Sequence, residues 1–211
     1  MRVIDIEQGS EDWLALREGK LTGTKLGKVF AKSRNEGELF NTERRANGFY
    51  QLLAERLAVS DGEDGLGSSR ERGKALEAIA VALAEHELGL KLVHGKVWQK
   101  NDWHITSPDA WTEDEKIAVE IKCLASWKHI QAIVEDEPPV EYRTEYLNYF
   151  LVNPKLETLY VYLFDPRFVK QTLQSHYWKI TREQVQGELA RLEDIAEEVE
   201  KQIEELVEKL G

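Results

Sequence analysis

Two carboxylates and a lysine stand close together between Ser107 and Lys122, and their types and spacing could support metal-dependent hydrolysis. Asp109 precedes Glu120 by eleven residues, and Lys122 follows Glu120 by two. Two acidic side chains and a lysine on one face would make a site for a hard divalent cation and a water molecule. The same spacing also arises by chance in a chain that is 32% charged. Whether this spacing indicates a metal site therefore depends on the secondary-structure elements that carry the three residues.

The segment from Ile117 to Lys122 alternates apolar and polar residues, which predicts a half-buried strand. Side chains on a strand alternate between its faces, so Glu120 and Lys122 should point one way while Val119 and Ile121 enter the core. Residues 111–116 are rich in turn-forming residues and let the chain reverse. We therefore expect Asp109 to lie beside Glu120, on the neighbouring strand.

The remaining pattern predicts an α/β fold with a central mixed sheet and helices on both sides. Further strands are expected at residues 93–99, 103–107 and 159–164, and a flexible loop at residues 60–69. Helices are expected at residues 10–17, from Asn41 or Thr42 to Leu57, at 69–88 with Gly89 as a left-handed cap, at 125–135 before Pro138-Pro139, and at 142–152.

Composition narrows the class of protein. The chain has 211 residues, of which 42% are hydrophobic, which is enough for one core with an appendage. No apolar run is long enough to span a membrane, and the first residues do not read as a secretory signal, so we expect a cytoplasmic protein. The single cysteine, Cys123, excludes an internal disulfide and any multi-cysteine zinc or iron–sulfur site.

The net charge of −11 argues against nucleic-acid binding, but the charge is unevenly distributed. Residues 181–211 carry −6 of it, which leaves −5 for residues 1–180, and a mildly acidic body can still present a basic groove. The tail also contains apolar residues at alternating spacings of four and three, which is a heptad seam. These residues are Val185, Leu189, Leu192, Ala196, Val199, Ile203, Leu206 and Leu210. The seam predicts either a helix that lies on its own domain or a surface for another protein or subunit.

Glu77 is a further candidate because its neighbours on the predicted helix are small or apolar. Gly73, Ala80, Val81 and Ala84 share its face. A carboxylate among such residues should be partly buried, and a buried charge is costly unless it is paired or linked to a metal. The alternative is a solvated glutamate at the edge of an amphipathic helix.

Taken in order along the chain, these motifs resemble a known family. The motifs are Arg72-Gly73-x-x-x-Glu77, Ser107-Pro108-Asp109-Ala110 and Glu120-Ile121-Lys122-Cys123, with Gly9-Ser10-x-x-Trp13-Leu14-x-x-Arg17-x-Gly19-x-Leu21-Thr22-Gly23-Thr24 before them and Tyr142, Asp165-Pro166-Arg167 and His176-Tyr177 after them. The set is similar to the lambda exonuclease and YqaJ-type viral recombinase family, which are alkaline exonucleases of the PD-(D/E)XK nuclease superfamily. The resemblance covers about residues 8–180.

The resemblance implies a role for each matching position. Asp109 and Glu120 would be metal ligands together with the backbone carbonyl of Ile121, and Lys122 would hold or activate the attacking water. Glu77 would support the metal through a water. The ions would be Mg²⁺, two per site, with Mn²⁺ expected to substitute.

The resemblance also assigns a site for the DNA end and an assembly. Arg17, Thr24 and Ser107 would bind the 5′ phosphate, and Trp13 would lie near the terminal base pair. A fork of donors such as arginine suits a terminal phosphate. The implied protein is a homotrimeric ring that acts on double-stranded DNA ends, and the C-terminal helix could dock a single-strand-annealing protein.

The expected function is thus Mg²⁺-dependent 5′-to-3′ exonuclease activity on one strand of duplex DNA, which leaves a 3′ overhang for homologous recombination. The fold would be a restriction-endonuclease-like PD-(D/E)XK core, with residues 1–180 as the exonuclease domain and residues 181–211 as an acidic amphipathic helix. The alternatives are another endonuclease of the superfamily and a catalytically silent DNA-binding scaffold.

Two positions depart from the family pattern. Glu145 stands where the family often has glutamine, and a carboxylate cannot donate a hydrogen bond to a phosphate. It could face a metal or be solvated, and the sequence assigns it no catalytic role. Ala110 replaces the glycine that ends the family's Ser-Pro-Asp-Gly motif, a mild change if the turn needs no positive φ.

Overall fold

The computed structural model describes residues 11–12, 15, 28–32, 40–58, 66–94, 97–101 and 104–210. The chain divides into two compact units, each made of several segments. The first unit is formed by Met1–Arg70, Leu124–Asp136 and Asp165–Ser175, and the second by Glu71–Cys123, Glu137–Phe164 and His176–Gly211. The functional division predicted from the sequence, an exonuclease domain of residues 1–180 and an acidic helix of residues 181–211, stays a prediction.

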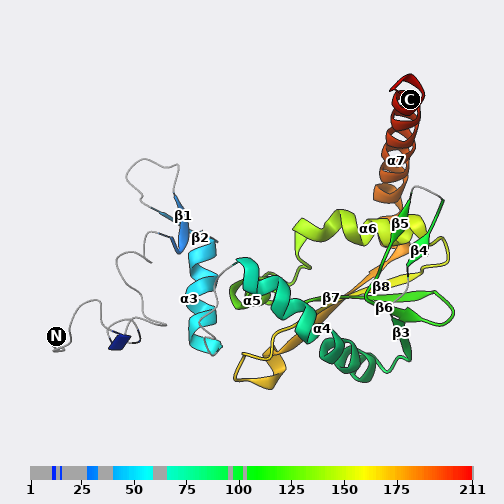
Figure 1. Ribbon diagram of the computed structural model, residues 1–211. Helices are drawn as coiled ribbons and strands as arrows, with labels where there is room; N and C mark the ends of the chain where they lie inside the picture. Colours follow the sequence, from blue (N-terminus) through cyan, green and yellow to red (C-terminus); the bar gives the residue numbers. More distant parts are fainter. Residues whose placement is uncertain are drawn as a thin grey trace. The chain divides into compact units, whose positions relative to one another are not determined.

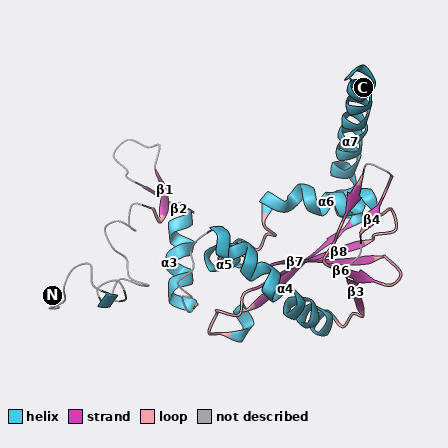
Figure 2. Cartoon of the chain, in the orientation of Figure 1, coloured by secondary structure: helices cyan, strands magenta, loops and turns pink. Residues whose placement is uncertain are grey.

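A five-stranded mixed sheet with the order β3-β6-β7-β8-β9 forms the centre of the second unit (Figures 1 and 2). Its strands are β3 (Leu92–His94), β6 (Ala110–Thr112), β7 (Ile117–Lys122), β8 (Thr158–Phe164) and β9 (Ser175–Thr181). The β3–β6 and β6–β7 pairs are antiparallel, whereas β7 and β8 run parallel in register from Ile117↔Thr158 to Lys122↔Leu163. A separate antiparallel hairpin joins β4 (Trp98–Gln99) and β5 (Ile105–Thr106).

Helices cover both faces of this sheet, as the packing of alternate strand residues shows. The helices are α4 (Leu66–Leu88), α6 (Arg143–Val152, after the short 3₁₀ turn η1, Val140–Tyr142) and α7 (Arg182–Leu210). Val119 and Ile121 pack with Ala80 and Ala84 of α4. Ala118 packs instead with residues of α6 and α7. Since neighbouring strand residues point to opposite faces, α4 lies on one face and α6 and α7 on the other. The predicted α/β fold with a flanked central sheet is confirmed.

The first unit has its own small core. Tyr50, Ala54, Ile130 and Phe168 form a buried cluster. The elements that supply or adjoin it are β1 (Phe30–Lys32), β2 (Phe40–Arg45), α3 (Asn47–Leu57), α5 (Ser126–Glu135) and the 3₁₀ turn η2 (Gln171–Leu173).

A buried ion pair orders the end of the same unit. Asp165, which is 1% exposed, accepts hydrogen bonds from Arg167 and from the Ser126 hydroxyl. The Asp165-Pro166-Arg167 motif is therefore held by an internal ion pair and by a hydrogen bond from the first residue of α5.

Several sequence predictions need correction at the ends of elements. Asn41 and Thr42 do not cap the second helix, because both lie in β2 and α3 begins at Asn47. The strand expected at residues 93–99 is divided into β3 and β4, and β6 and β9 were not predicted. Gly89 ends α4 with a φ of +65°, as predicted. Ala110 is the first residue of β6 and is not among the described positions with positive φ, so the site tolerates the loss of glycine.

The seam of α7 changes character along the helix. Val185 and Leu189 are 1% and 8% exposed and belong to the sheet core, and Leu192 packs against it. Val199 is 50% exposed. The first turns of the helix thus lie on their own unit, while the seam reaches the surface by Val199. None of the described helices is long and apolar enough to cross a membrane.

Leu189→Ala should lower the free energy of unfolding by roughly 2–5 kcal/mol, because it leaves a cavity under α7. Val199→Ala on the same seam should change it by less than about 0.5 kcal/mol, because that side chain is already half exposed. Urea unfolding followed by circular dichroism measures both values. Equal effects of the two substitutions would contradict the division of the seam.

Candidate active site

Asp109 and Glu120 meet where β6 pairs with β7. Asp109 immediately precedes β6, whose Ala110 lies opposite Val119. The Oδ2 atom of Asp109 accepts a hydrogen bond of 2.7 Å from the backbone N–H of Ile121. The turn at residues 113–116 reverses the chain as predicted, and it brings Asp109 beside the Glu120–Ile121 peptide.

Glu120 is more deeply buried than alternation alone predicts. Its exposed fraction is 3%, although it lies on the face opposite Val119. The Lys122 ammonium donates to its Oε1 at 2.6 Å, and the Tyr149 hydroxyl donates to its Oε2 at 2.6 Å. The expected partition into a core face and a wet face is therefore wrong for β7, because α6 and α7 cover the second face.

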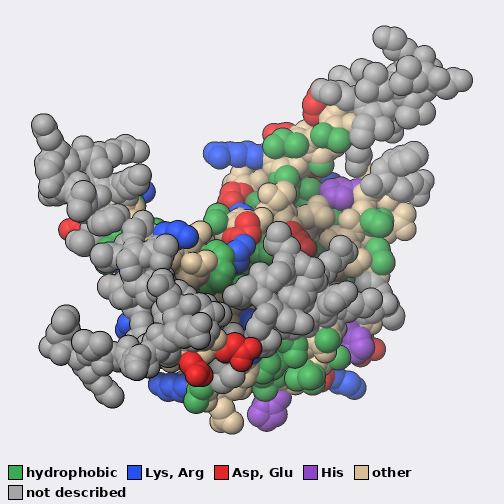
Figure 3. Space-filling model, turned by 60° about the vertical axis from the view of Figure 1, so that its left-hand side comes forward, with side chains coloured by type: hydrophobic (Ala, Val, Ile, Leu, Met, Phe, Trp, Pro, Cys, Tyr) green, Lys and Arg blue, Asp and Glu red, His purple; other side chains and the backbone are tan. Residues whose placement is uncertain are grey.

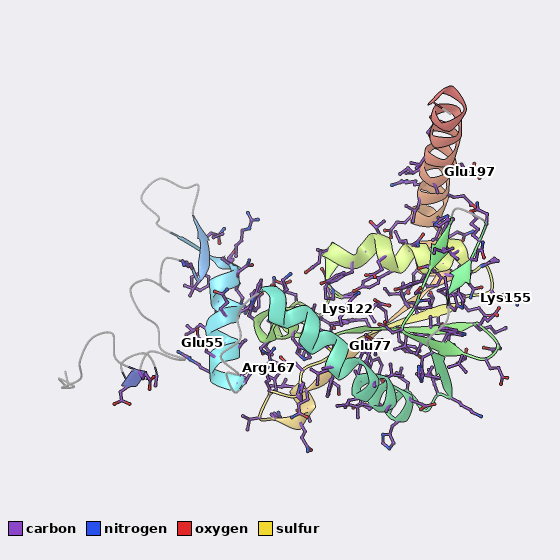
Figure 4. All side chains as sticks on the ribbon, viewed as in Figure 1. Glu55, Glu77, Lys122, Lys155, Arg167 and Glu197 are labelled. Carbon is purple, nitrogen blue, oxygen red and sulfur yellow. The ribbon has the colours of Figure 1, made fainter. Side chains whose placement is uncertain are left out.

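Lys122, labelled in Figure 4, has partners from two elements. Besides Glu120, its Nζ donates to Oε2 of Glu145 on α6 at 2.8 Å. The same Nζ lies 4.3 Å from the centroid of the Tyr142 ring, close enough for a cation–π contact. Two carboxylates and an aromatic face thus fix the ammonium at the carboxyl end of β7.

Burial dominates the electrostatics of the two acids. It raises the pKa of Asp109 to about 6, with a further contribution from the charge of Glu77, against the lowering effect of the Ile121 N–H. Burial and the charge of Asp109 raise the pKa of Glu120 to about 8. Burial disfavours the Lys122 ammonium, but Glu120 and Glu145 outweigh it and raise its pKa. The lysine therefore does not offset the cost of ionising both carboxyl groups, and the metal-free site retains protons that solvated acids would lose.

This arrangement fits a hard divalent cation. Carboxylate and carbonyl oxygens are the ligands that Mg²⁺ prefers, and a cation would favour the ionised form of both carboxyl groups, which burial disfavours. Asp109, Glu120 and the carbonyl of Ile121 would hold it. Within the described ranges there is no group of three His, Cys, Asp or Glu side chains that could form a site by themselves. The remaining ligands would have to be water or substrate oxygens.

Residues 12–153 match the family model of the YqaJ-like viral recombinase domain. The chain belongs to this family. A comparison with curated proteins finds no match. Among solved structures, the fold is similar to that of LHK-Exo, an alkaline exonuclease from Laribacter hongkongensis, at 23% identity. Its complex with dAMP gives a TM-score of 0.57 and covers 95% of this chain and 97% of that chain. A second LHK-Exo structure gives a TM-score of 0.51 and covers 93% and 100%.

Glu77 of the YqaJ-like domain is exposed, and the prediction of partial burial is wrong. Leu76 packs against the core that contains Ala80 and Ala84, but Glu77 between them stays exposed; Figure 4 labels it on α4. Its charge nevertheless raises the pKa of Asp109, so it lies within electrostatic reach of the site.

The predicted DNA-end residues are only partly described. Ser107 is exposed and stands two residues before Asp109, at the entrance to β6. Arg17, Thr24 and Trp13 lie outside the described residues, and their roles stay predictions. On the face drawn in Figure 3, described acidic and basic side chains are interspersed, and neither sign forms an extended patch.

Sequence reasoning missed Tyr149, which is 2% exposed and binds Glu120 directly. It also gave no role to the ring of Tyr142 or to Glu145. A signal for all three was present, since residues 142, 145 and 149 are spaced by three and four and so share one face of a helix. What the spacing could not show is that this face meets β7.

The metal-free YqaJ-like domain should become less stable as the pH rises from about 4 to about 8. The unfolded chain ionises both acids near pH 4, whereas the folded pKa values are about 6 for Asp109 and about 8 for Glu120. The folded state thus holds extra protons in this window, and its advantage is lost as they dissociate. Urea unfolding in EDTA at several pH values measures this slope.

Glu120→Gln removes one of the two titrations and should flatten the slope. Glu157→Gln is the matched control, because Glu157 is an exposed carboxylate paired with Lys116. A slope that Glu120→Gln leaves as steep as in the unaltered protein would contradict the assignment.

Proposed function

We propose that this protein is a Mg²⁺-dependent exonuclease that degrades one strand of double-stranded DNA from its 5′ end and leaves a 3′ overhang for recombination. The observation that carries the proposal is the cluster of Asp109, Glu120 and Lys122 at the β6–β7 junction of a YqaJ-like domain. The fold it shares with LHK-Exo, which is described as an alkaline exonuclease and was crystallised with dAMP, supports the same reaction class.

When bound, Mg²⁺ would lower the pKa of a water molecule and neutralise the charge that develops on the phosphodiester. Asp109, Glu120 and the Ile121 carbonyl would hold the ion. The Ile121 N–H and the Tyr149 hydroxyl fix the two carboxylates, so these ligands need little rearrangement. Lys122, held at the edge of the same cluster, would orient the attacking water. Mn²⁺ would substitute, since the donors are oxygens.

The 5′ end would be recognised through its phosphate. Arg17, Thr24 and Ser107 are its proposed ligands, with Trp13 against the terminal base pair. Ser107 supports this proposal by its exposure two residues from Asp109. Cleavage polarity rests on membership of the family.

The proposed assembly is a homotrimer that encloses DNA, with a single-strand-annealing protein as partner of the C-terminal helix. A ring would hold DNA by topology, which suits a chain with a net charge of −11. The exposure of Val199 and Ile195 leaves the later part of α7 for the partner, while its first turns belong to the core. Sedimentation of the full chain measures the assembly, and a monomer under conditions of processive digestion would contradict it.

Asp109→Ala, Glu120→Ala and Lys122→Ala should each reduce cleavage of linear duplex DNA in Mg²⁺ by roughly 10²-fold or more, because each removes a metal ligand or the group that orients the water. Duplexes labelled at the 5′ or the 3′ end, with a 5′ phosphate or a 5′ hydroxyl, give the polarity and the end preference. EDTA should abolish the reaction.

Glu157→Ala and Lys155→Ala are matched controls, because both residues form ion pairs on the surface. They should cleave as the unaltered protein does. Near-normal turnover by Asp109→Ala would refute the site. Cleavage of covalently closed circles would indicate an endonuclease instead.

A further inference from the structure

Glu145 contacts the candidate site from outside the sheet. It lies in the first turn of α6 and accepts a hydrogen bond from the Lys122 ammonium at 2.8 Å. The Glu145 side chain is 43% exposed, whereas that of Lys122 is only 13% exposed. A partly exposed carboxylate on one element therefore holds a largely buried lysine on another.

Glu120, the other carboxylate that Lys122 contacts, also has other partners. Glu120 accepts from Lys122 through one oxygen and from Tyr149 through the other, and it is also the proposed metal ligand. If Glu120 held a cation, its oxygen that faces Lys122 would carry less charge and would hold the ammonium less firmly. Glu145 has no place among the proposed ligands, so its bond to Lys122 would persist. The centroid of the Tyr142 ring lies 4.3 Å from the same Nζ, so the ring contacts the ammonium as a third neighbour.

We propose that Glu145 is a positioning residue that keeps the Lys122 ammonium in place while Glu120 binds the metal. The inference rests on the proposed nuclease function for its catalytic consequence, but the contact itself does not. An exposed ion pair contributes little, whereas this one restrains a lysine that is mostly removed from water.

The neighbouring Arg143–Glu188 pair offers a matched comparison. Arg143 adjoins Glu145 at the start of α6, and it bonds Glu188 of α7. The Glu188 side chain is 45% exposed, nearly the same as that of Glu145. Glu188→Ala therefore removes an equally exposed, ion-paired carboxylate from the same unit without touching Lys122.

The first test is independent of activity. Reductive methylation of the metal-free full chain, followed by peptide mass spectrometry, measures the reaction rate of Lys122 relative to Lys155, whose side chain is 68% exposed. Glu145→Ala should raise this ratio about threefold or more by freeing the ammonium. Glu145→Gln, whose amide oxygen still accepts a hydrogen bond, should raise it less, and Glu188→Ala should leave it unchanged. An unchanged ratio in Glu145→Ala would overturn the proposal.

The second test separates positioning from substrate binding. With saturating Mg²⁺ and linear duplex DNA, Glu145→Ala should lower kcat roughly 10-fold with KM within about twofold, because a displaced lysine costs rate and not affinity. Glu145→Gln should recover most of kcat. A normal kcat in Glu145→Ala, with Lys122 released in the methylation test, would also overturn the proposal. An unaltered protein that cleaves no DNA would refute the nuclease function, and the methylation ratio would still decide whether Glu145 holds Lys122.

Discussion

The burial of Glu120, with a partly buried Asp109 beside it, is the constraint on which the arrangement of the second unit depends. A buried charge without partners costs several kcal/mol, and two such charges also repel each other. Three donors stabilise the two acids. The β7 backbone donates to Asp109, and a hydroxyl of α6 and the ammonium at the end of β7 donate to Glu120. These donors do not fully offset the effect of burial, since the pKa values of both acids stay raised. A divalent cation at the proposed site would offset the remaining cost.

Helix α6 connects this cluster to the rest of the unit, and α7 anchors the carboxyl end of α6. At the carboxyl end, the Arg182 guanidinium donates to the backbone carbonyl of Phe150 in the last turn of α6, and to those of Asn153 and Leu156 just after it. At the amino end, Arg143 and Glu188 form only an exposed ion pair, which contributes little. The acidic tail thus begins as part of the framework of the site. This explains why the seam residues Val185 and Leu189 are buried whereas Val199 is not.

The parts of this structure that could be predicted are those with a strong local signal. Period-two alternation gave β7 to the residue, and Gly89 marked the end of α4. Strand β6 was missed because it has only three residues. Its buried Trp111 stands beside turn-forming residues, so the segment has the composition of a loop. The start of α3 was predicted too early because asparagine is a favoured helix cap. In the structure, Asn41 instead lies in β2 and pairs with Ala31 of β1.

The site itself was predictable in its residue types but not in its supports. The eleven-residue separation of Asp109 and Glu120 indicated adjacent strands, and they are adjacent. The burial of Glu120, the hydroxyl of Tyr149 and the bond from Lys122 to Glu145 all depend on which face of α6 meets the sheet, and no local pattern encodes that. Glu77 shows the converse, since helical spacing suggested burial at a position that stays exposed although Leu76 and Ala80 beside it pack against the core.

The parallel pairing of β7 with β8 has a consequence for the order in which the protein can be assembled during synthesis. Lys122 leaves the ribosome well before Leu163, its partner across the pair, and the Glu120–Tyr149 bond joins residues 29 positions apart. Until α6, β8 and the first turns of α7 have emerged, nothing removes Glu120 from water, so a nascent chain carries it as an ordinary solvated glutamate. The two acids acquire their raised affinity for protons only after the last core residues, around Leu189, are released. Contacts of such long sequence separation form slowly, and the cluster should be among the last parts of the protein to mature.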